Sequence, residues 1–270
     1  MTDSLSAPRP AEDQEPGTAG GSPLRVAVLG ARGRMGSAAC RAIETAEDLD
    51  LVARIGHGDD LSALTEADAQ VAVDLTVPDA ALDNVLWAID HDIHVVVGTT
   101  GWTEERLQQV STALEDHPQV GVLIAPNFAI GAVLAMRFAE IAARYYESAE
   151  IIELHHPDKL DAPSGTARHT AAAIARGRAE AGLGPVPDAT RQDPEGARGA
   201  VLDGIHVHAV RLRGLTAHEE VVFGGEGEQF TLRHDSFDRV SFMPGVLLGV
   251  REVGSWPGLT IGLDQYMDLG

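Results

Sequence analysis

The segment at 155–167, HHPDKLDAPSGTA, gathers side chains that could move a proton and bind an anion. Its first two residues, His155 and His156, carry imidazole groups of a type that titrates near neutral pH. Lys159 follows with a positive charge. A predicted helix then opens with two hydroxyl groups around a glycine, at Ser164, Gly165 and Thr166. Because hydroxyls and free backbone N–H groups at a helix start bind carboxylates, the segment predicts acid–base chemistry on an anionic substrate.

The histidines also raise the alternative of a zinc site. His206 and His208 would share one face of a later strand, and with His155 and His156 they make four imidazoles. No cysteine or carboxylate completes a recognisable ligand spacing among them. We therefore expect no metal site, and a structural role is the other interpretation of an isolated histidine pair.

A second motif, GARGRMG at 30–36, spaces its glycines as G-x-x-G-x-x-G. It follows a predicted buried strand at 24–30 and opens a predicted helix at 34–47. Dinucleotide-binding folds place glycines there because the backbone must approach a diphosphate closely at a helix N-terminus. Arg32 and Arg34 add positive charge for phosphates. The alternative is a glycine-rich turn without a ligand, but the context favours nucleotide binding.

This chain lacks the acidic residue that usually binds the ribose hydroxyls in dinucleotide-binding folds. That residue is found about 20 residues past the glycines. That position falls on Gly56 and His57, and the next acids, Asp59 and Asp60, come slightly late. Without a carboxylate nothing repels a 2′-phosphate, and Arg54 or His57 could bind one. We therefore expect little discrimination between NADH and NADPH, or a mild preference for NADPH.

Strands and helices alternate through the first half of the chain, which is typical of a doubly wound parallel α/β sheet. Apolar runs predict further strands near 50–55, 71–75, 93–97 and 120–124. Helical patterns follow at 79–90 and 103–116. This Rossmann-type sheet would place its helices on both faces.

The second half has a different pattern, and the change near residue 127 marks a domain boundary. A long helix fits 128–146, a strand 149–155, and a further helix begins near 165. Consecutive extended stretches at 204–213, 217–223 and 228–234 favour a mixed or antiparallel sheet. Helical spacing returns at 239–253. We expect a second α+β domain with a mixed sheet.

With these motifs in place, the chain resembles the dihydrodipicolinate reductase family over about 23–270. The resemblance rests on GARGRMG, on VGTTG at 97–101, on APNFAIG at 125–131, on ELHHPDKLDAPSGTA at 153–167 and on RHDSFDRVSFMPGVLLGVR at 233–251. It implies NAD(P)H-dependent reduction of a cyclic dicarboxylate, 4-hydroxy-tetrahydrodipicolinate, in the diaminopimelate and lysine pathway.

The resemblance also implies roles for individual residues. His155 matches the proton donor and Lys159 the second catalytic residue. Contacts to the substrate carboxylates are implied for His156, Ser164, Gly165 and Thr166. Cofactor contacts are implied for Gly30, Gly33, Arg34, Met35, Gly36, Gly98, Thr99, Thr100, Ala125, Pro126, Asn127 and Phe128. We also expect contacts from Ala31 and Arg32, which lie in the same loop, and from His57, on the ribose argument.

The domain organisation implied by the resemblance is discontinuous. Residues 23–127 and 240–270 would form the dinucleotide-binding domain, so that the chain end returns to the first sheet. Residues 128–239 would bind substrate and join a homotetramer through their sheets.

Composition narrows the partners further. The formal net charge is −21, from 20 Lys+Arg against 41 Asp+Glu, which argues against nucleic acid and anionic membranes. No apolar run is long enough to cross a bilayer. Residues 1–22 are rich in proline, glycine and acid and predict a disordered tail rather than a targeting signal. The single Cys40 favours a reducing, cytoplasmic setting.

Two other functions remain open at this point. The chain could be an NAD(P)-binding regulator or assembly factor that has lost its chemistry, although His155, Lys159 and Thr166 are all present. It could also be a semialdehyde-type dehydrogenase, which needs a nucleophilic cysteine. Cys40 falls on the predicted helix after the glycine loop, where a packing role is expected.

Overall fold

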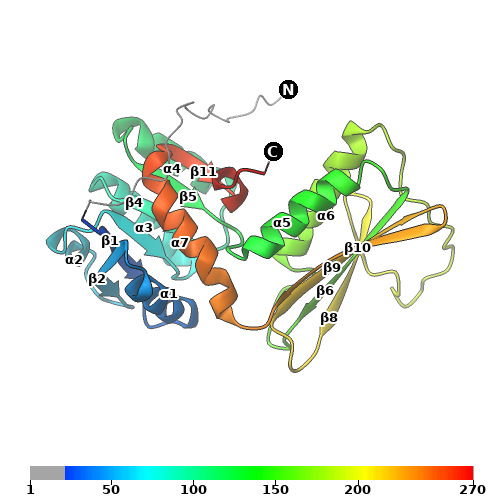
Figure 1. Cartoon of the computed structure of the whole chain (residues 1–270), viewed down its shortest axis with the longest axis horizontal. Coiled ribbons are helices and arrows are strands. Elements are labelled where there is room, and N and C mark those ends of the chain that lie inside the picture. The colour runs from blue at the N-terminus through cyan, green and yellow to red at the C-terminus, as the bar shows by residue number, and fades with distance from the viewer. Residues whose placement is uncertain (1–21, 270) are drawn as a thin grey trace.

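The computed structural model describes residues 22–269, which form two units arranged along the long axis of the molecule (Figure 1). One unit is built on a six-stranded sheet and the other on a five-stranded sheet. The expected disordered tail, 1–22, lies outside the described residues except for Ser22.

The first sheet is parallel throughout, with the strand order β11-β5-β4-β3-β1-β2. Its strands are β1 (Leu24–Leu29), β2 (Leu49–Ile55), β3 (Val71–Asp74), β4 (His94–Val97), β5 (Gly121–Ile124) and β11 (Gly258–Ile261). Most of β1, and all of β3 and β5, is buried. These strands are continuous apolar runs because helices cover both faces of the sheet.

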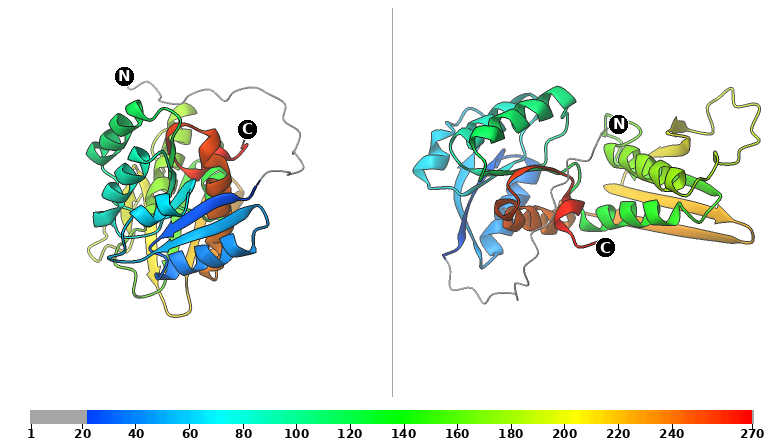
Figure 2. Two further views of the ribbon diagram at one scale, coloured as in Figure 1. Left: turned by 90° about the vertical axis from the view of Figure 1, so that its left-hand side faces the viewer. Right: turned by 90° about the horizontal axis from the view of Figure 1, so that it is seen from above.

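Alternate residues of β1 point to the two faces, and two hydrophobic clusters result. Val26 and Val28 pack with α1 and α7, whereas Ala27 and Leu29 pack with α3 and α4. Figure 2 shows α3 and α4 on the side of the sheet opposite α7. The helices of this unit are α1 (Arg34–Thr45), α2 (Ser62–Glu66), α3 (Pro78–Asp90), α4 (Glu104–Asp116) and α7 (Met243–Glu252).

The second unit contains a mixed sheet in the order β10-β9-β6-β8-β7. Only β6 and β8 are parallel neighbours in it. Helices α5 (Ile130–Ala142) and α6 (Gly165–Glu180) lie together along one side of this sheet (Figure 1). Its strands are β6 (Ser148–His155), β7 (Ala200–Leu202), β8 (Ile205–Arg211), β9 (Ala217–Gly225) and β10 (Glu228–Ser236). The predicted fold class, a Rossmann-type sheet with a second α+β unit, is confirmed.

Some element boundaries differ from the expectations. The helix expected at 128–146 begins at Ile130, because the Asn127 side chain accepts a hydrogen bond from the Ala129 N–H (2.8 Å) and keeps the backbone before α5 extended. The helix expected at 239–253 begins as a 3₁₀ turn, η1 (Arg239–Phe242), capped by Asp238. Pattern analysis did not predict α2, β7 or β11.

The last strand returns the chain to the first sheet. After α7 and a short 3₁₀ turn, η2 (Val253–Ser255), β11 pairs in parallel with β5. A final 3₁₀ turn, η3 (Leu263–Tyr266), follows and packs against α5 and α7. The first sheet therefore contains strands from both ends of the chain.

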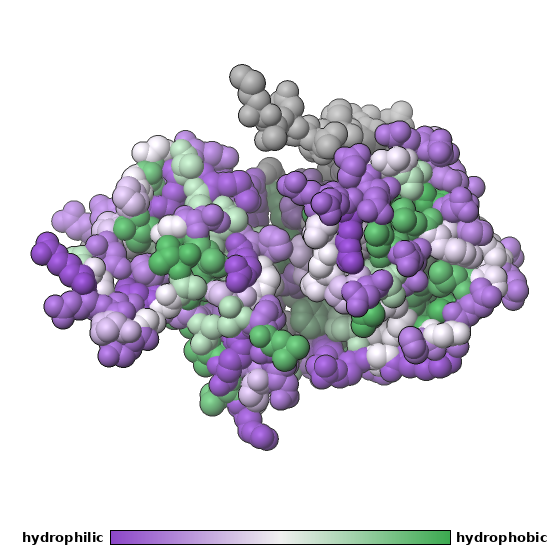
Figure 3. Space-filling view, turned by 180° about the vertical axis from the view of Figure 1, so that it is seen from behind, coloured by the Kyte–Doolittle hydropathy of each residue, from purple (hydrophilic) through white to green (hydrophobic). Residues whose placement is uncertain are grey.

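On the face of the molecule shown in Figure 3, the surface between the two units is hollowed, and hydrophobic patches lie among the hydrophilic residues of both units. None of the helices described is long and apolar enough to cross a membrane.

Candidate active site

The glycine loop after β1 forms a backbone cradle at the start of α1. Gly30 has φ +75°, and a Cβ there would lie 2.6 Å from the Leu75 carbonyl oxygen. A Cβ on Gly36 would collide with the Gly30 carbonyl oxygen. The first turn of α1 contains no acidic residue. The loop therefore requires glycine for tight packing and presents a helix N-terminus that fits a diphosphate.

The other loop residues differ in exposure. Ala31 is buried, and its N–H donates to the Ile55 carbonyl (3.0 Å), so it contributes to the loop structure. Arg32 and Arg34 are exposed, and Met35 is half-buried.

Arg32 lies across Gly56 at the end of β2. A Cβ on Gly56 would come within 2.8 Å of the Arg32 guanidinium carbon. Asp59 pairs with Arg32 (3.0 Å) and accepts a hydrogen bond from the Gly56 N–H (2.8 Å). The structure thus brings a carboxylate back to this position from three residues downstream and places an arginine beside it. Arg54, by contrast, is paired with Glu44 of α1, and His57 is exposed.

The turn after β4 is held by a buried carboxylate. Thr99 is buried, and its hydroxyl donates to Asp74 at the end of β3 (3.1 Å). Asp74 also accepts from Thr76 and from the Asn84 side chain. The Phe128 ring packs over Gly98, where a Cβ would lie 2.6 Å from it. Thr100 is exposed.

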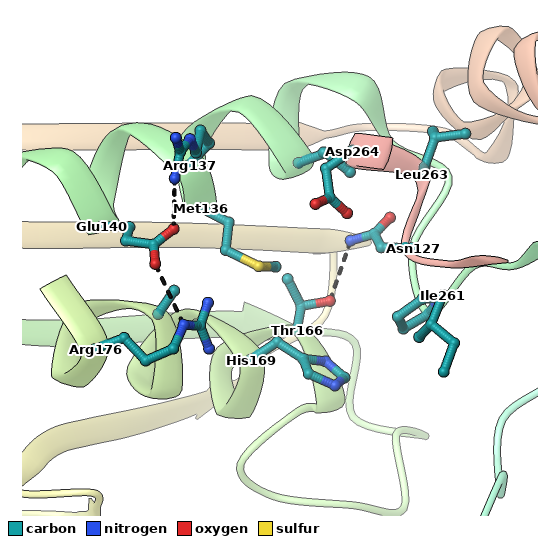
Figure 4. Close-up of a pocket in the computed structure, with 14 residues that line it drawn as sticks. Asn127, Met136, Arg137, Glu140, Thr166, His169, Arg176, Ile261, Leu263 and Asp264 are labelled. Atoms are coloured by element: carbon teal, nitrogen blue, oxygen red, sulfur yellow. Dashed lines mark hydrogen bonds and ion pairs between the residues drawn. The ribbon is translucent and has the colours of Figure 1, made fainter. Parts of the chain in front are cut away.

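The segment after β5 joins the two units. The Ala125 N–H donates to the Val97 carbonyl (2.9 Å), and Pro126 follows. The Asn127 amide then donates to the Thr166 hydroxyl in the second unit (3.1 Å). Figure 4 shows these two side chains pointing toward one another at the edge of a cavity of about 210 Å³ between α5, α6 and the β11–η3 segment.

The second unit contributes the end of β6 and the start of α6. The Ser164 hydroxyl caps α6 by accepting from the Ala167 N–H (3.1 Å) and is buried. Gly165 is exposed, and no acidic residue lies in the first turn of this helix. His155, Ser164 and Thr166 line a small cavity of about 30 Å³ that also includes Asn127. This helix start, next to an imidazole, fits a carboxylate-bearing ligand.

Three of the residues expected in the substrate site, Gly165, Lys159 and His156, do not line that cavity. Lys159 lies in the loop after β6, and its ammonium group pairs with Asp161 (2.8 Å). His156 is half-buried directly after β6.

Three buried carboxylates around the site were missed by the sequence analysis. They are Asp74 at the Thr99 turn, Glu153 beside His155, and Glu219, which bonds to Thr170 of α6. Burial and the negative charge of Glu153 raise the pKa of Glu219 to about 7, although the hydrogen bond to Thr170 lowers it. Glu153 lies only two residues before His155, whereas Thr99 and Thr170 are 25 and 49 residues from their carboxylate partners, where no local spacing indicates the contact.

The histidines do not gather into a metal site. His206 and His208 point to the face of the second sheet that also carries Ile152, whereas His155 lies on the face of Ile151 and Glu153. Within residues 22–269 no group of three or more histidine, cysteine, aspartate or glutamate side chains is arranged to hold a metal ion.

Cys40 is buried in α1, and burial raises the pKa of its thiol despite the nearby Arg54. A buried, protonated thiol in the helix core is unsuited to nucleophilic attack. This position contradicts the semialdehyde-type alternative.

A glycine-rich helix start in one unit is joined through Asn127 and Thr166 to the start of α6, which lies beside the His155 imidazole. This is the arrangement of a two-unit, dinucleotide-dependent oxidoreductase. Comparison with known proteins makes the class specific. The family model described as dihydrodipicolinate reductase, N-terminus, matches residues 24–128, and the model for the C-terminus matches 131–267. The chain belongs to the dihydrodipicolinate reductase family.

Individual relatives agree. The chain is 62% identical over 248 residues to the 4-hydroxy-tetrahydrodipicolinate reductase of Streptomyces griseus, covering 92% of this chain and 99% of that one. It is 63% identical over 246 residues to the Cutibacterium acnes enzyme of the same name, covering 91% and 99%. The solved structure of dipicolinate-bound dihydrodipicolinate reductase from Paenisporosarcina sp. TG-14 matches with a TM-score of 0.81 and 41% identity, covering 91% of this chain and 100% of that one. The family makes this chain an NAD(P)H-dependent oxidoreductase whose first unit binds NAD(P).

Proposed function

We propose that this chain reduces 4-hydroxy-2,3,4,5-tetrahydrodipicolinate to tetrahydrodipicolinate with NADPH or NADH, in the diaminopimelate pathway to lysine. The relatives named above carry this activity in their names. The observation that carries the proposal is the cavity where His155 meets the start of α6 beside Asn127. An inactive regulator of the same fold would not need these groups together.

The residues divide the reaction between the two units. The reduced nicotinamide, when bound, supplies a hydride to C4 of the substrate ring. The expected contacts are the backbone cradle at 30–36 for the diphosphate and the segments 98–100 and 125–128 for the ribose and nicotinamide. A reduced dinucleotide held there would face the second unit, because Asn127 bonds to Thr166.

His155 acts as the general acid in this proposal. Its Nδ1 atom is bonded to Glu153 (2.6 Å), so Nε2 remains to deliver a proton to the substrate. General acid catalysis of this kind typically contributes about 10²–10⁴ in rate.

The substrate is a dianion, and two features balance its charge. The N–H groups of exposed Gly165 and half-buried Thr166 bind one carboxylate at the positive end of α6. Lys159 exchanges Asp161 for the other carboxylate, with His156 beside it. Lys159 is the only lysine in the chain, and all other residues in the Lys+Arg count are arginines. Ser164 acts by capping the helix rather than by direct contact.

The domain roles follow from the same division. Residues 23–127 and 240–270 bind the dinucleotide, and residues 128–239 bind substrate and form the contacts of a homotetramer. Half-buried side chains on the sheet face away from α5 and α6, such as Ile152 and Val222, support the assembly role. The enzyme works in the cytoplasm. Sedimentation of the purified chain tests the tetramer.

The activity is tested by following NADPH and NADH oxidation with the product of the preceding synthase as substrate. His155→Gln is expected to lower kcat by about 10²–10⁴, and Lys159→Ala is expected to lower kcat/KM for the dicarboxylate because it removes a carboxylate contact, while the Kd for NADPH stays unchanged in both. A wild-type chain that oxidises neither cofactor contradicts the proposed function. Equal losses of cofactor affinity in both variants contradict the assignment of these residues to the substrate unit.

The single lysine allows a second, direct test. An amine-acylating reagent should modify only Lys159 and the N-terminal amine, which mass spectrometry distinguishes. Dipicolinate should slow acylation of Lys159 and leave the N-terminal amine unaffected. Equal rates with and without dipicolinate exclude Lys159 from the carboxylate site.

A further inference from the structure

Glu153 is a fully buried carboxylate in the middle of the second unit. It lies on β6, two residues before His155, so both side chains point to the same face of the sheet. One of its oxygens accepts from His155 Nδ1 at 2.6 Å. The other accepts from the backbone N–H of Ser164 at 3.1 Å. A single side chain thus contacts the imidazole and the turn that begins α6.

Arg211 on β8 completes the environment of this carboxylate. Its guanidinium donates to both Glu153 oxygens, at 2.7 and 2.8 Å. It also donates to the Asp161 carbonyl at 2.7 Å, in the loop that carries Lys159. A planar guanidinium bound through two hydrogen bonds holds a carboxylate in one orientation.

The carboxylate remains ionised despite its burial. Burial raises the pKa of Glu153, but the hydrogen bonds and positive charges of His155 and Arg211 outweigh it and lower the pKa to about 2. An ionised carboxylate can only accept hydrogen bonds, so His155 must place a hydrogen on Nδ1.

We propose that Glu153 is a positioning residue, which fixes the tautomer and ring orientation of His155 and ties this imidazole to the substrate-binding start of α6. The inference rests on the proposed function, in which His155 donates the proton. After His155 gives its Nε2 proton to the substrate, the neutral ring keeps the proton on Nδ1 and continues to donate it in a hydrogen bond to Glu153. The ring therefore returns to one orientation in every cycle.

Other titratable groups around this pair also affect its pH dependence, and two of them, His218 of β9 and His234 of β10, line the same cavity as His155. Arg211 approaches from β8 and Glu219 from β9, where the charge of Glu153 acts on it. Lys159 and Asp161 lie in the loop after β6. Among the described residues, the His155 ring is hydrogen-bonded to Glu153 and to none of these other groups.

The first test is Glu153→Gln, which keeps the size of the side chain and removes its charge. We expect kcat to fall at least about tenfold, as part of the general acid contribution, with an unchanged Kd for NADPH. The pH profile of kcat should move to lower pH, because the protonated ring loses its carboxylate partner. In a His155→Gln background the same substitution should cause no further loss of kcat.

Glu140→Gln is the matched control. Glu140 of α5 is also paired with arginines, Arg137 at 3.0 Å and Arg176 at 3.3 Å, so its substitution also removes a carboxylate from arginine pairs in the second unit. It should leave the pH profile and kcat at wild-type values. If Glu153 only supports the fold, Glu153→Gln lowers kcat without moving the pH profile. Its fold-loss in kcat then multiplies with the fold-loss caused by His155→Gln in the double variant.

A measurement on the wild-type chain covers the case in which Glu153→Gln does not fold. Nitrogen-15 NMR of labelled histidine, with the His155 signal assigned by its loss in His155→Gln, reports the tautomer of the neutral ring. We expect the Nδ1–H form, and the Nε2–H form overturns the proposal. Wild-type activity is measured first, so that an inactive wild type contradicts the proposed function, whereas an active wild type with the Nε2–H form contradicts only the role of Glu153.

Discussion

The Asn127 side-chain amide donates a hydrogen bond to the Thr166 hydroxyl over 3.1 Å, and this bond joins the two units at the candidate site. Asn127 follows β5 of the first sheet, whereas Thr166 lies in the first turn of α6. The amide oxygen of Asn127 also accepts from the Ala129 N–H at 2.8 Å. One side chain therefore determines both the path of the connection and its contact with the start of α6.

Asn127→Ala removes both hydrogen bonds. A hydrogen bond of this kind contributes about 1 kcal/mol, so kcat/KM for the dicarboxylate should fall roughly five- to tenfold. Steady-state kinetics measures this. Thr166→Val removes the same inter-unit bond from the other side. The double variant should therefore lose less kcat/KM than the product of the two single losses, because both substitutions remove one common hydrogen bond. Losses that multiply fully would show that the bond does not couple the two residues.

The second prediction concerns cofactor choice. Arg32 lies over Gly56 and pairs with Asp59 at 3.0 Å, and Asp59 also bonds to the Gly56 N–H, so a 2′-phosphate would take the place of Asp59 on Arg32. Arg32→Ala should lower kcat/KM for NADPH about tenfold more than for NADH, the effect of about 1.4 kcal/mol from one lost charged contact. Wild type should show little discrimination or a mild preference for NADPH. A strong wild-type preference for NADH, or equal losses with both cofactors in the variant, contradicts this role.

Much of the first sheet was predictable because buried parallel strands are continuous apolar runs. VAVD at 71–74 and HVVV at 94–97 stand out from the polar turns around them. β11 was not predictable from its pattern, since GLTI at 258–261 is short and partly exposed. Its place in the sheet depends on pairing with β5, more than 130 residues earlier.

The site was predictable where its residues are adjacent in sequence. The glycine loop and HHPDKLDAPSGTA each gather their chemistry within a few positions, so spacing indicates them. The carboxylates that support those residues also bond to groups far away in the sequence. Glu153 lies two residues before His155 but also bonds to Ser164 and Arg211, and Asp74 bonds to Asn84 and Thr99. An acidic residue inside an apolar strand indicates a buried partner but does not identify it.

The third prediction follows from Asp74. Asp74→Ala leaves the Thr99 hydroxyl and the Asn84 amide without their acceptor, and unpaired buried groups cost about 1–3 kcal/mol each. The variant should unfold at lower temperature and bind NADPH more weakly, because the turn at Thr99 loses its support. Thermal unfolding and NADPH titration measure both effects. Asp90→Ala, at an exposed position on α3, is the control and should change neither.

The last prediction uses the buried carboxyl group of Glu219. Its pKa is raised to about 7, chiefly by burial, and the folded protein therefore keeps it protonated under mildly acidic conditions. Its partner Thr170 has one hydroxyl hydrogen and two close oxygens, Glu219 Oε1 at 2.6 Å and the Thr166 carbonyl at 3.1 Å. The Thr170 hydroxyl donates to Glu219 Oε1, whereas Glu219 Oε2 is buried without a hydrogen-bond partner among the described residues. Ionisation would place an additional buried charge near Glu153.

The sign of the stability change follows from proton binding. Below about pH 4.3, the ordinary glutamate pKa, both the folded and the unfolded states are protonated at this position. Between that pH and about 7 the unfolded chain ionises while the folded protein does not, so this group lowers the free energy of unfolding as pH rises. Glu219→Gln removes the effect and should stabilise the protein by up to about 3 kcal/mol at pH 8, with a much smaller gain near pH 5. Denaturant unfolding at the two pH values measures it, with the exposed Glu226→Gln as control. A gain that is equal at both pH values would show that Glu219 does not titrate in this range.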